Sequence, residues 1–225
     1  MANASPTRIT VLISGGGTNL QALIDTANTP ALPNAQIVRV ISNRKSAFGL
    51  QRAEKAGIPT LYHNLVGYKK RFPDPAGAEG KFTQARDEFD KDLAKLVLED
   101  KPDIIVCAGW MHILAPAFLS PLKDVGVPVI NLHPALPGKF NGTHAIERAY
   151  AAFQKGEVDG TGVMVHHVIP EVDMGPPILV REIEIKKEDT VDDLEGRIHA
   201  TEWKVIVEAT KLAIEELRKE KEKRN

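Results

Sequence analysis

Short runs of β-branched and apolar residues alternate, along the first half of the chain, with segments whose apolar positions recur every three or four residues. The runs are residues 9–13, 37–41, 59–62 and 104–108, and helical patterns open near Asn19 and cover residues 47–56. The run at 104–108 is almost wholly apolar, as expected of a strand covered on both faces. This alternation predicts an α/β protein with a mostly parallel, twisted, doubly wound sheet and helices on both faces.

A long stretch separates the third run from the fourth. Residues 63–80 hold glycines, prolines and the cluster Lys69, Lys70 and Arg71, which predicts a surface loop with solvated basic side chains. From Phe82 to Val97, apolar residues recur at intervals of three and four. That spacing predicts a long amphipathic helix.

The pattern changes after Gly138. Residues 162–169 and 178–185 predict two further strands, joined by a bend rich in proline and glycine. Thr190 is the predicted N-cap of a long C-terminal helix, with Asp193 at the third helical position. Residues 215–225 are almost wholly charged and are expected to fray into solvent. With no repeat and no long linker, residues 1–225 are predicted to form one domain.

Composition narrows the class of protein. The chain has 225 residues, 26% of them charged, and a net charge of −1, which gives no electrostatic reason to expect nucleic acid or an anionic membrane as partner. No apolar stretch approaches the roughly 20 residues that span a bilayer, and the N-terminal apolar residues belong to the first strand, so a cytoplasmic protein is expected. The lone Cys107 excludes an intrachain disulfide and a cysteine zinc site. It is interpreted as a buried hydrophobe, and no metal is expected.

A glycine-rich turn lies between the first strand and the first helix. Free N–H groups at a helix N-terminus favour an anion, and the alternative is a tight turn without a ligand. The dinucleotide fingerprint needs a glycine where Leu20 stands and an acidic residue after the second strand, where Asn43 and Arg44 stand. No Gly-Lys-Ser/Thr follows either, which excludes a P-loop. A single phosphate group fits best. The turn comprises Gly15, Gly16, Gly17, Thr18 and Asn19.

An apolar run ends in Asn131, Leu132 and His133 and is stopped by Pro134. Alternation along a strand puts Asn131 and His133 on one face, at the carboxyl end where parallel sheets bind ligands. An amide can hold a carbonyl oxygen as it becomes an oxyanion, and an imidazole can move a proton. No nucleophile motif accompanies them, so the attacking group is predicted to be a substrate atom or water. Asp173 or, less favourably, Glu171 would supply the carboxylate that orients His133.

Five blocks of sequence together resemble one family. The chain resembles the folate-dependent phosphoribosylglycinamide formyltransferases, also called glycinamide ribonucleotide transformylases, over residues 8–212. The sequence ALPGKFNGTHAIERA is most similar to that of fungal members. The blocks occur in the family's order and read VLISGGGTNLQALID, VISNRKSAFGLQRAEKAGIPT, AGWMHILAPAFLS, NLHPALPGKFNGTHAIERA and HHVIPEVDMGPPIL. The resemblance implies a Rossmann-like formyltransferase fold with a phosphate-binding half of about residues 1–125 and a catalytic half of about 126–225. It implies formyl transfer from 10-formyltetrahydrofolate, as cosubstrate, to the amine of glycinamide ribonucleotide in purine biosynthesis, by a monomer or homodimer.

The same resemblance implies roles for individual residues. Asn131 would hold the formyl oxygen, His133 would assist at the tetrahedral intermediate, and Asp173 would tune His133. The glycine turn would bind the phosphate, and Glu202 would contact the sugar or glycinamide end. Two departures stand out: Trp203 follows Glu202 where the family often has histidine, and His112 stands where many relatives have arginine. The implied folate contacts are Arg86, Met111, His112, Ile113, Leu114, Asn131, Ile169, Pro170, Glu171, Val172 and Asp173.

Other readings stay open at this stage. Arg86 could instead form a salt bridge on the helix surface, and His144 could neighbour the site or not. His166 and His167 must face opposite ways, and His166 matches the family position. A methionyl-tRNA formyltransferase would typically carry an extra RNA-binding domain, and a formyltetrahydrofolate hydrolase would leave the phosphate turn idle. A catalytically silent folate or nucleotide binder is the alternative outside enzymes.

Overall fold

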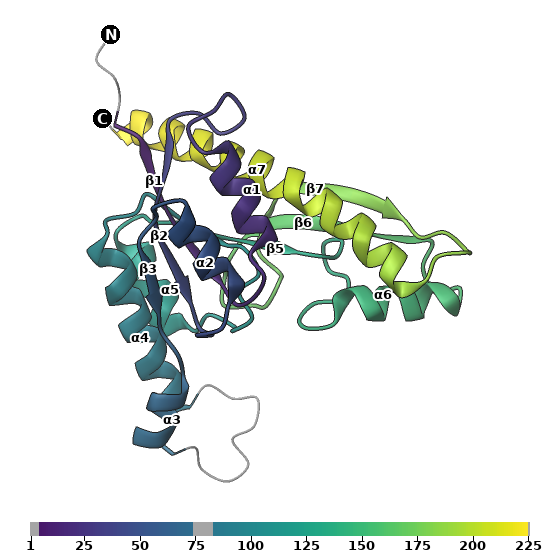
Figure 1. Ribbon diagram of the computed structural model, residues 1–225, viewed down its shortest axis with the longest axis horizontal. Coiled ribbons are helices and arrows are strands. Elements are labelled where there is room, and N and C mark those ends of the chain that lie inside the picture. The colour runs from purple at the N-terminus through teal and green to yellow at the C-terminus, as the bar shows by residue number, and fades with distance from the viewer. Residues whose placement is uncertain (1–4, 74–82, 225) are drawn as a thin grey trace.

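One seven-stranded sheet runs through the molecule in the order β3-β2-β1-β4-β5-β6-β7 (Figure 1). The computed structural model describes residues 5–73 and 83–224. The first five strands pair in parallel, and β6 and β7 join antiparallel, so the predicted mostly parallel sheet is confirmed. The strands are β1 (Thr7–Ile13), β2 (Ala35–Ser42), β3 (Thr60–Tyr62), β4 (Ile104–Cys107), β5 (Val129–His133), β6 (Gly160–His167) and β7 (Pro177–Glu184).

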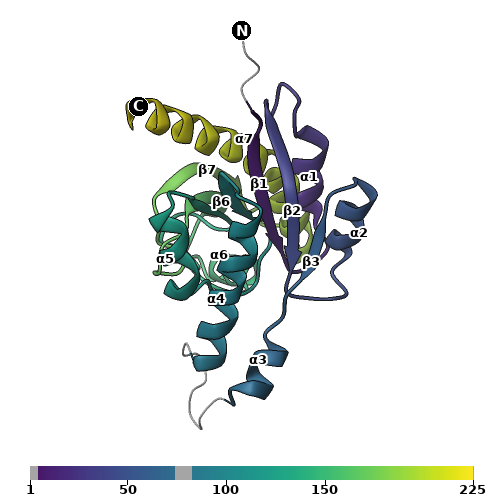
Figure 2. The same ribbon diagram turned by 90° about the vertical axis from the view of Figure 1, so that its left-hand side faces the viewer.

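Helices cover both faces of this sheet, as predicted. Figure 2 shows α4 and α5 on one side of the parallel strands and α1 and α2 on the other. The long α7 crosses the face that α1 covers (Figure 1). The helices are α1 (Thr18–Thr26), α2 (Phe48–Lys55), α3 (Val66–Arg71), α4 (Gln84–Glu99), α5 (Pro116–Asp124), α6 (Ala145–Gln154) and α7 (Val191–Arg224).

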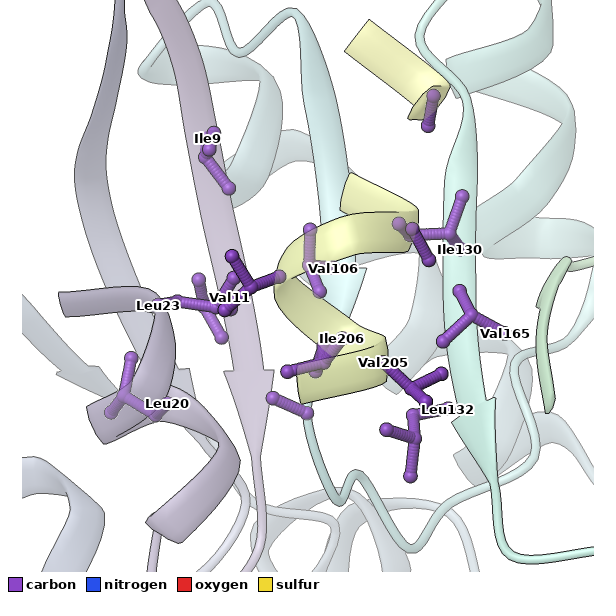
Figure 3. Close-up of a cluster of buried hydrophobic side chains, with 14 of the residues drawn as sticks. Ile9, Val11, Leu20, Leu23, Val106, Ile130, Leu132, Val165, Val205 and Ile206 are labelled. Carbon is purple, nitrogen blue, oxygen red and sulfur yellow. The ribbon is translucent and has the colours of Figure 1, made fainter. Parts of the chain in front are cut away.

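Alternate residues of β1, β2, β4 and β5 pack into two separate cores, one on each face of the sheet. Val11 of β1 and Leu132 of β5 pack with α1 and α7, where Val205 and Ile206 complete the cluster (Figure 3). The neighbouring positions Leu12 and Ile105 pack on the opposite face against α4 and α5. These four strands are therefore covered on both faces, which explains why their sequences are mostly apolar.

Three helices were not predicted from the sequence. Helix α3 lies within the stretch predicted as a loop, where residues 74–80 lie outside the described part of the chain. Helix α5 begins with Pro116 in its first turn, a position where the missing N–H costs nothing. Helix α6 follows His144, whose φ of 57° ends the preceding loop. The predicted helix at residues 82–97 is α4, although Phe82 lies outside the described residues.

The C-terminal helix begins as predicted and ends differently. Thr190 Oγ1 accepts the N–H of Asp193 at 3.2 Å, and a carboxylate oxygen of Asp193 accepts the N–H of Thr190 at 2.9 Å, forming a reciprocal cap. The expected fraying of residues 215–225 is wrong for the described part, since α7 stays helical to Arg224. Arg218 donates to Thr7 at 3.0 Å and Lys221 pairs with Asp103 at 2.6 Å. These contacts hold the charged end against the amino end of the sheet.

Within residues 5–73 and 83–224, no helix is both long enough and apolar enough to cross a membrane.

Candidate active site

A cavity of about 570 Å³ opens at the carboxyl ends of β1, β4 and β5. Three segments that follow these strands form most of its wall: residues 15–19, 107–114 and 131–134. The remaining lining comes from residues 142–145 at the start of α6, from β6, from the loop between β6 and β7, and from α7. Parallel sheets bind ligands at this edge, so the fold puts the cavity where chemistry is expected.

Asn131, His133, Asp173 and His166 lie close together on the cavity wall. Nδ1 of His133 lies 3.5 Å from Oδ2 of Asp173, and Nδ2 of Asn131 lies 3.5 Å from Oδ1 of the same carboxylate. His166 pairs directly with Asn131 across β5 and β6, with Nε2 of the imidazole 3.3 Å from Nδ2 of the amide. The three residues predicted to be catalytic are thus brought together, with a second imidazole beside them.

Hydrogen bonding restricts the protonation of the second imidazole. Nδ1 of His166 lies 2.9 Å from the carbonyl oxygen of His167, which can only accept, so Nδ1 carries a proton. Nε2 then accepts from Asn131 when the ring is neutral, or donates to Asp173, 3.5 Å away, when the ring is charged. His167 points to the opposite face, where Nε2 lies 3.5 Å from Glu216.

The electrostatics of the centre favour a neutral His133 beside an ionised Asp173. Burial lowers the pKa of His133, outweighing the nearby Asp173 carboxylate, which raises it. Burial alone would raise the pKa of Asp173, but the side chains of His166 and His133 and the N–H of Gly142 bring it below its usual range. The carbonyl group of Phe140 also raises the pKa of the His133 ring, although less than burial lowers it. Nε2 of His133 is buried and has no hydrogen-bond partner among the described residues.

The loop between β6 and β7 holds Asp173 in a fixed position. Asp173 has a φ of 56°, a left-handed conformation in which its carboxylate turns back toward β5. The N–H of Gly142 donates to Oδ2 at 2.7 Å. A side chain on Gly175 would overlap the carbonyl oxygen of His167, so only glycine allows the loop to approach β6 this closely. Glu171, the alternative carboxylate, does not line the cavity.

The glycine turn forms part of the cavity wall. Gly17 has a φ of 72° and precedes α1, and a Cβ there would lie 2.6 Å from the Cα of Gly49. Helix α2 binds two carbonyl groups of the turn. The N–H of Gly49 donates to the carbonyl oxygen of Gly15 at 3.1 Å, and Nε of Arg52 donates to the carbonyl oxygen of Gly16 at 2.9 Å. Among the described backbone hydrogen bonds, none uses the N–H of Gly15, Gly16 or Gly17. This is the arrangement that binds an anion.

Helix α7 adds a buried carboxylate beside the glycine turn. Nδ2 of Asn19 donates to Glu202 at 3.1 Å, and burial raises the pKa of Glu202 despite that hydrogen bond. Oδ1 of Asn19 is buried without a hydrogen-bond partner among the described residues. His199 and the partly exposed Trp203 flank Glu202 on the cavity wall. All six residues predicted for the ribonucleotide therefore line the cavity.

The residues predicted for the folate divide into two groups. Arg86, Pro170 and Glu171 lie outside the lining. Arg86 stands behind the wall, where Nη1 lies 2.8 Å from Nδ1 of His112 and Nη2 contacts the carbonyl oxygen of Ile113. The residues that do line the cavity are Met111, His112, Ile113, Leu114, Asn131, Ile169, Val172 and Asp173.

Several lining residues had no assigned role in the sequence analysis. His144, which was left open there, and Thr143 line the cavity just before α6, and Trp110 and Val168 line it as well. Cys107 also borders the cavity, but burial raises the pKa of its thiol to about 12, which excludes it as a nucleophile at neutral pH. Strand alternation was the signal that could identify His166, because it forces His166 and His167 to opposite faces.

The described lining of the cavity offers an anion no cationic lysine or arginine side chain. An anion there meets N–H groups and histidines instead. Within residues 5–73 and 83–224, no group of three or more His, Cys, Asp or Glu side chains is arranged to hold a metal ion.

Comparisons with known proteins agree on one family. Residues 7–210 match the family model described as "Formyl transferase". The phosphoribosylglycinamide formyltransferase of Schizosaccharomyces pombe is 50% identical over 202 residues, which is 89% of this chain and 94% of that protein. That of Saccharomyces cerevisiae is 50% identical over 217 residues, 94% of this chain and 99% of that protein. The crystal structure of glycinamide ribonucleotide transformylase 1 from Symbiobacterium toebii has a TM-score of 0.78 and 33% identity, covering 95% of this chain and 90% of its own.

Proposed function

The chain belongs to the formyl transferase family, and we propose that it transfers the formyl group of 10-formyltetrahydrofolate to the amine of glycinamide ribonucleotide, a step of purine biosynthesis. The relatives that it matches across nearly their whole length are named phosphoribosylglycinamide formyltransferase. The observation that carries the proposal is that Asn131, His133 and Asp173 come together in a cavity that the glycine turn also lines.

The proposed reaction is a direct transfer between two bound substrates. The amine lone pair attacks the formyl carbon, and the carbonyl electron pair moves to the oxygen. The product of this attack is a tetrahedral intermediate in which the new C–N bond is complete. The oxyanion then collapses, the bond to N10 of the folate breaks, and N10 leaves with that electron pair and takes up a proton. The enzyme forms no covalent bond, which agrees with the protonated state of Cys107, the thiol that borders the cavity.

Asn131 is the proposed donor to the oxyanion. Its Nδ2 contacts with His166 and Asp173 are 3.3 and 3.5 Å, longer than the roughly 2.7–3.2 Å of a normal hydrogen bond. One N–H hydrogen can therefore be given to a formyl oxygen at little cost. Removing such a donor typically slows turnover by about 10²–10³.

His133 is the proposed proton carrier between the two nitrogens. We assign the proton to Nδ1, which faces Asp173, so that Nε2 is unprotonated and takes the proton that the attacking amine loses. The lowered pKa of His133 keeps the ring in this state at neutral pH. The ionised Asp173 then stabilises the imidazolium until its proton passes to N10.

The glycine turn is the proposed site of the ribonucleotide phosphate. Its unused N–H groups and the N-terminus of α1 suit a phosphate, and Asn19 and Glu202 suit the polar sugar or glycinamide. This turn favours a phosphorylated acceptor over water, and so favours the transferase over a formyltetrahydrofolate hydrolase. The apolar wall at Met111–Leu114 and the loop holding Ile169 and Val172 would bind the folate, and we place the reaction in the cytoplasm.

The function is tested by following folate product by absorbance with both substrates together and with each alone. Transfer predicts product only when both are present, and little when the ribonucleotide lacks its phosphate. Product from the formyl folate alone would identify a hydrolase. Binding of both ligands without product would identify a silent relative and reject the proposal.

A further inference from the structure

Helix α2, which packs beside α1, holds the glycine turn from outside the cavity (Figure 1). The N–H of Gly49 donates to the carbonyl oxygen of Gly15 at 3.1 Å, and Nε of Arg52 donates to that of Gly16 at 2.9 Å. The described lining of the cavity includes every residue of the turn but neither Gly49 nor Arg52. The two donors therefore bind the turn on the side away from the cavity.

The direction of each carbonyl group in the turn determines the direction of the next N–H. The peptide bonds of the turn are trans, so the carbonyl of one residue and the N–H of the next point to opposite sides of the chain. Binding the Gly15 carbonyl from outside turns the N–H of Gly16 toward the cavity, and binding the Gly16 carbonyl does the same for Gly17. No backbone hydrogen bond among the described residues uses either N–H. Arg52 thus orients one of the two N–H groups that face the anion site.

The Arg52 side chain is itself held by further contacts. Its Nη1 donates to Oε1 of Gln21 on α1 at 3.1 Å, and its guanidinium carbon lies 5.0 Å from the centre of the Phe48 ring. Nε2 of Gln21 donates in turn to Asp25 at 2.8 Å. These contacts restrict the guanidinium before any ligand binds, so little further order is needed when an anion arrives.

The charge of Arg52 supplies what the cavity wall lacks. The described lining contains no lysine and no arginine, so no cationic side chain of these types touches a ligand there. A charged donor on a carbonyl oxygen polarises the peptide group and makes its N–H a stronger donor. Through the peptide group between Gly16 and Gly17, Arg52 strengthens the hydrogen bond that Gly17 gives to an anion.

We infer that Arg52 is a positioning residue for the ribonucleotide phosphate, acting through the Gly16 carbonyl without touching the substrate. The inference rests on the proposed function, because the phosphate is that of the proposed acceptor. Hydrogen bonds that involve a charged group change an equilibrium by about 10- to 100-fold. Arg52 is half-buried and acts through the turn, so its removal should weaken phosphate binding at the lower end of that range, by about tenfold.

The first experiment measures the binding of inorganic phosphate to the protein alone, through the amide NMR shifts of Gly16 and Gly17. Arg52→Met keeps the length of the side chain without its charge or its donors, and Arg52→Lys keeps the charge and one donor group. The control Lys55→Met makes a matched change at an exposed cation on the same helix. We expect about tenfold weaker binding in Arg52→Met, with the larger loss of response at Gly17, partial recovery in Arg52→Lys, and wild-type binding in the control.

The second experiment measures KM for glycinamide ribonucleotide and for the same acceptor without its phosphate, each with saturating formyl folate. Arg52→Met should raise KM for the phosphorylated acceptor by about tenfold. It should leave unchanged the KM for the dephosphorylated acceptor, the KM for the folate, and kcat. A general defect of the fold would instead affect both acceptors alike, so the two acceptors distinguish positioning from stability.

The outcomes separate this inference from the function that it rests on. Formyl transfer that fails with both acceptors would overturn the proposed function, while the phosphate titration would still decide the role of Arg52. Wild-type protein that binds no phosphate would overturn the phosphate turn and this inference with it. Phosphate binding that Arg52→Met retains, or an equal loss for both acceptors in that variant, would overturn the role of Arg52 alone. An equal loss of phosphate binding in Lys55→Met would also overturn it, because net charge would then explain the effect.

Discussion

Asp90 offers a test of how the cavity wall is held, through the pH dependence of stability. Its side chain is fully buried on α4, where Oδ2 accepts the N–H of Ala115 at 3.3 Å and lies 3.6 Å from Nη2 of Arg86. Oδ1 has no hydrogen-bond partner among the described residues. Burial raises the pKa of Asp90 from 3.8 to about 6, although Arg86 and the Ala115 N–H lower it.

The magnitude follows from that shift. The difference between 3.8 and about 6 is roughly two pKa units, and each unit corresponds to about 1.4 kcal/mol, so ionising Asp90 costs about 3 kcal/mol of folding free energy. Because the pKa of Asp90 is higher in the folded than in the unfolded state, the protonated carboxyl group stabilises the fold. This stabilisation is fully present below the unfolded pKa and is lost as pH rises through about 6.

Asp90→Asn keeps the shape of the protonated acid and does not titrate. The variant should match the wild type near pH 4 and be more stable at pH 7 by up to about 3 kcal/mol. Its KM for the folate should rise, because Arg86 loses the carboxylate that steadies it against His112 and Ile113. Urea unfolding of both proteins between pH 4 and pH 7, with equal slopes, measures the difference.

A matched control lies two residues further along the same helix. The pKa of Asp92 is lowered overall, since Lys95 and Tyr68 outweigh its partial burial. That carboxylate stabilises the fold above its unfolded pKa, so Asp92→Asn should lose stability toward pH 7 rather than gain it. Curves for Asp90→Asn and wild type that stay parallel from pH 4 to pH 7 would refute the raised pKa and the argument built on it.

Three further substitutions test the site itself. Asn131→Ala should lower kcat by roughly 10²–10³ with little change in stability, and near-normal turnover would remove Asn131 from the oxyanion role. Asp173→Asn should lower kcat by about 10²-fold or more while the Tm shifts by only a few degrees, because the loop packs little core; a large fall in Tm with normal turnover would contradict this. Gly17→Ala places a Cβ 2.6 Å from the Cα of Gly49 at a φ of 72°, so KM for the ribonucleotide should rise more than KM for the folate. Equal changes in both KM values would argue against phosphate binding by the turn.

Strand and helix alternation was enough to predict the sheet and most of its covering helices. Of the three helices that were not predicted, α5 and α6 have sequences that carry some helical signal. Helix α6 has apolar residues at helical spacing, namely Ile146, Ala149, Tyr150 and Phe153. Its start is not predictable from the sequence because His144, the residue before it, has a left-handed backbone conformation rather than a usual N-cap. In α5 the internal Pro121 obscured the pattern. The retained helical end of α7 depends on contacts with Thr7 and Asp103, which are distant in sequence.

The candidate site was predictable where local pattern determines position. Alternation along β5 puts Asn131 and His133 on one face, and the glycine turn follows directly from β1. The choice between Asp173 and Glu171 depends on a left-handed residue in the β6–β7 loop, which spacing alone does not specify. Likewise, α4 was predicted, but the sequence does not say whether Arg86 enters the cavity or lies behind its wall. That depends on where His112 and Ile113, which follow β4, pack against α4.

The most direct test of the account is the fate of the formyl carbon. Wild-type protein is mixed with a formyl folate labelled with ¹³C in the formyl group and with glycinamide ribonucleotide, and the products are identified by NMR and mass spectrometry. Transfer through Asn131, His133 and Asp173 predicts the label on the glycine nitrogen of the ribonucleotide, at a rate that falls in Asn131→Ala and Asp173→Asn. Label recovered as formate, or transfer that is unchanged in both variants, would contradict the account.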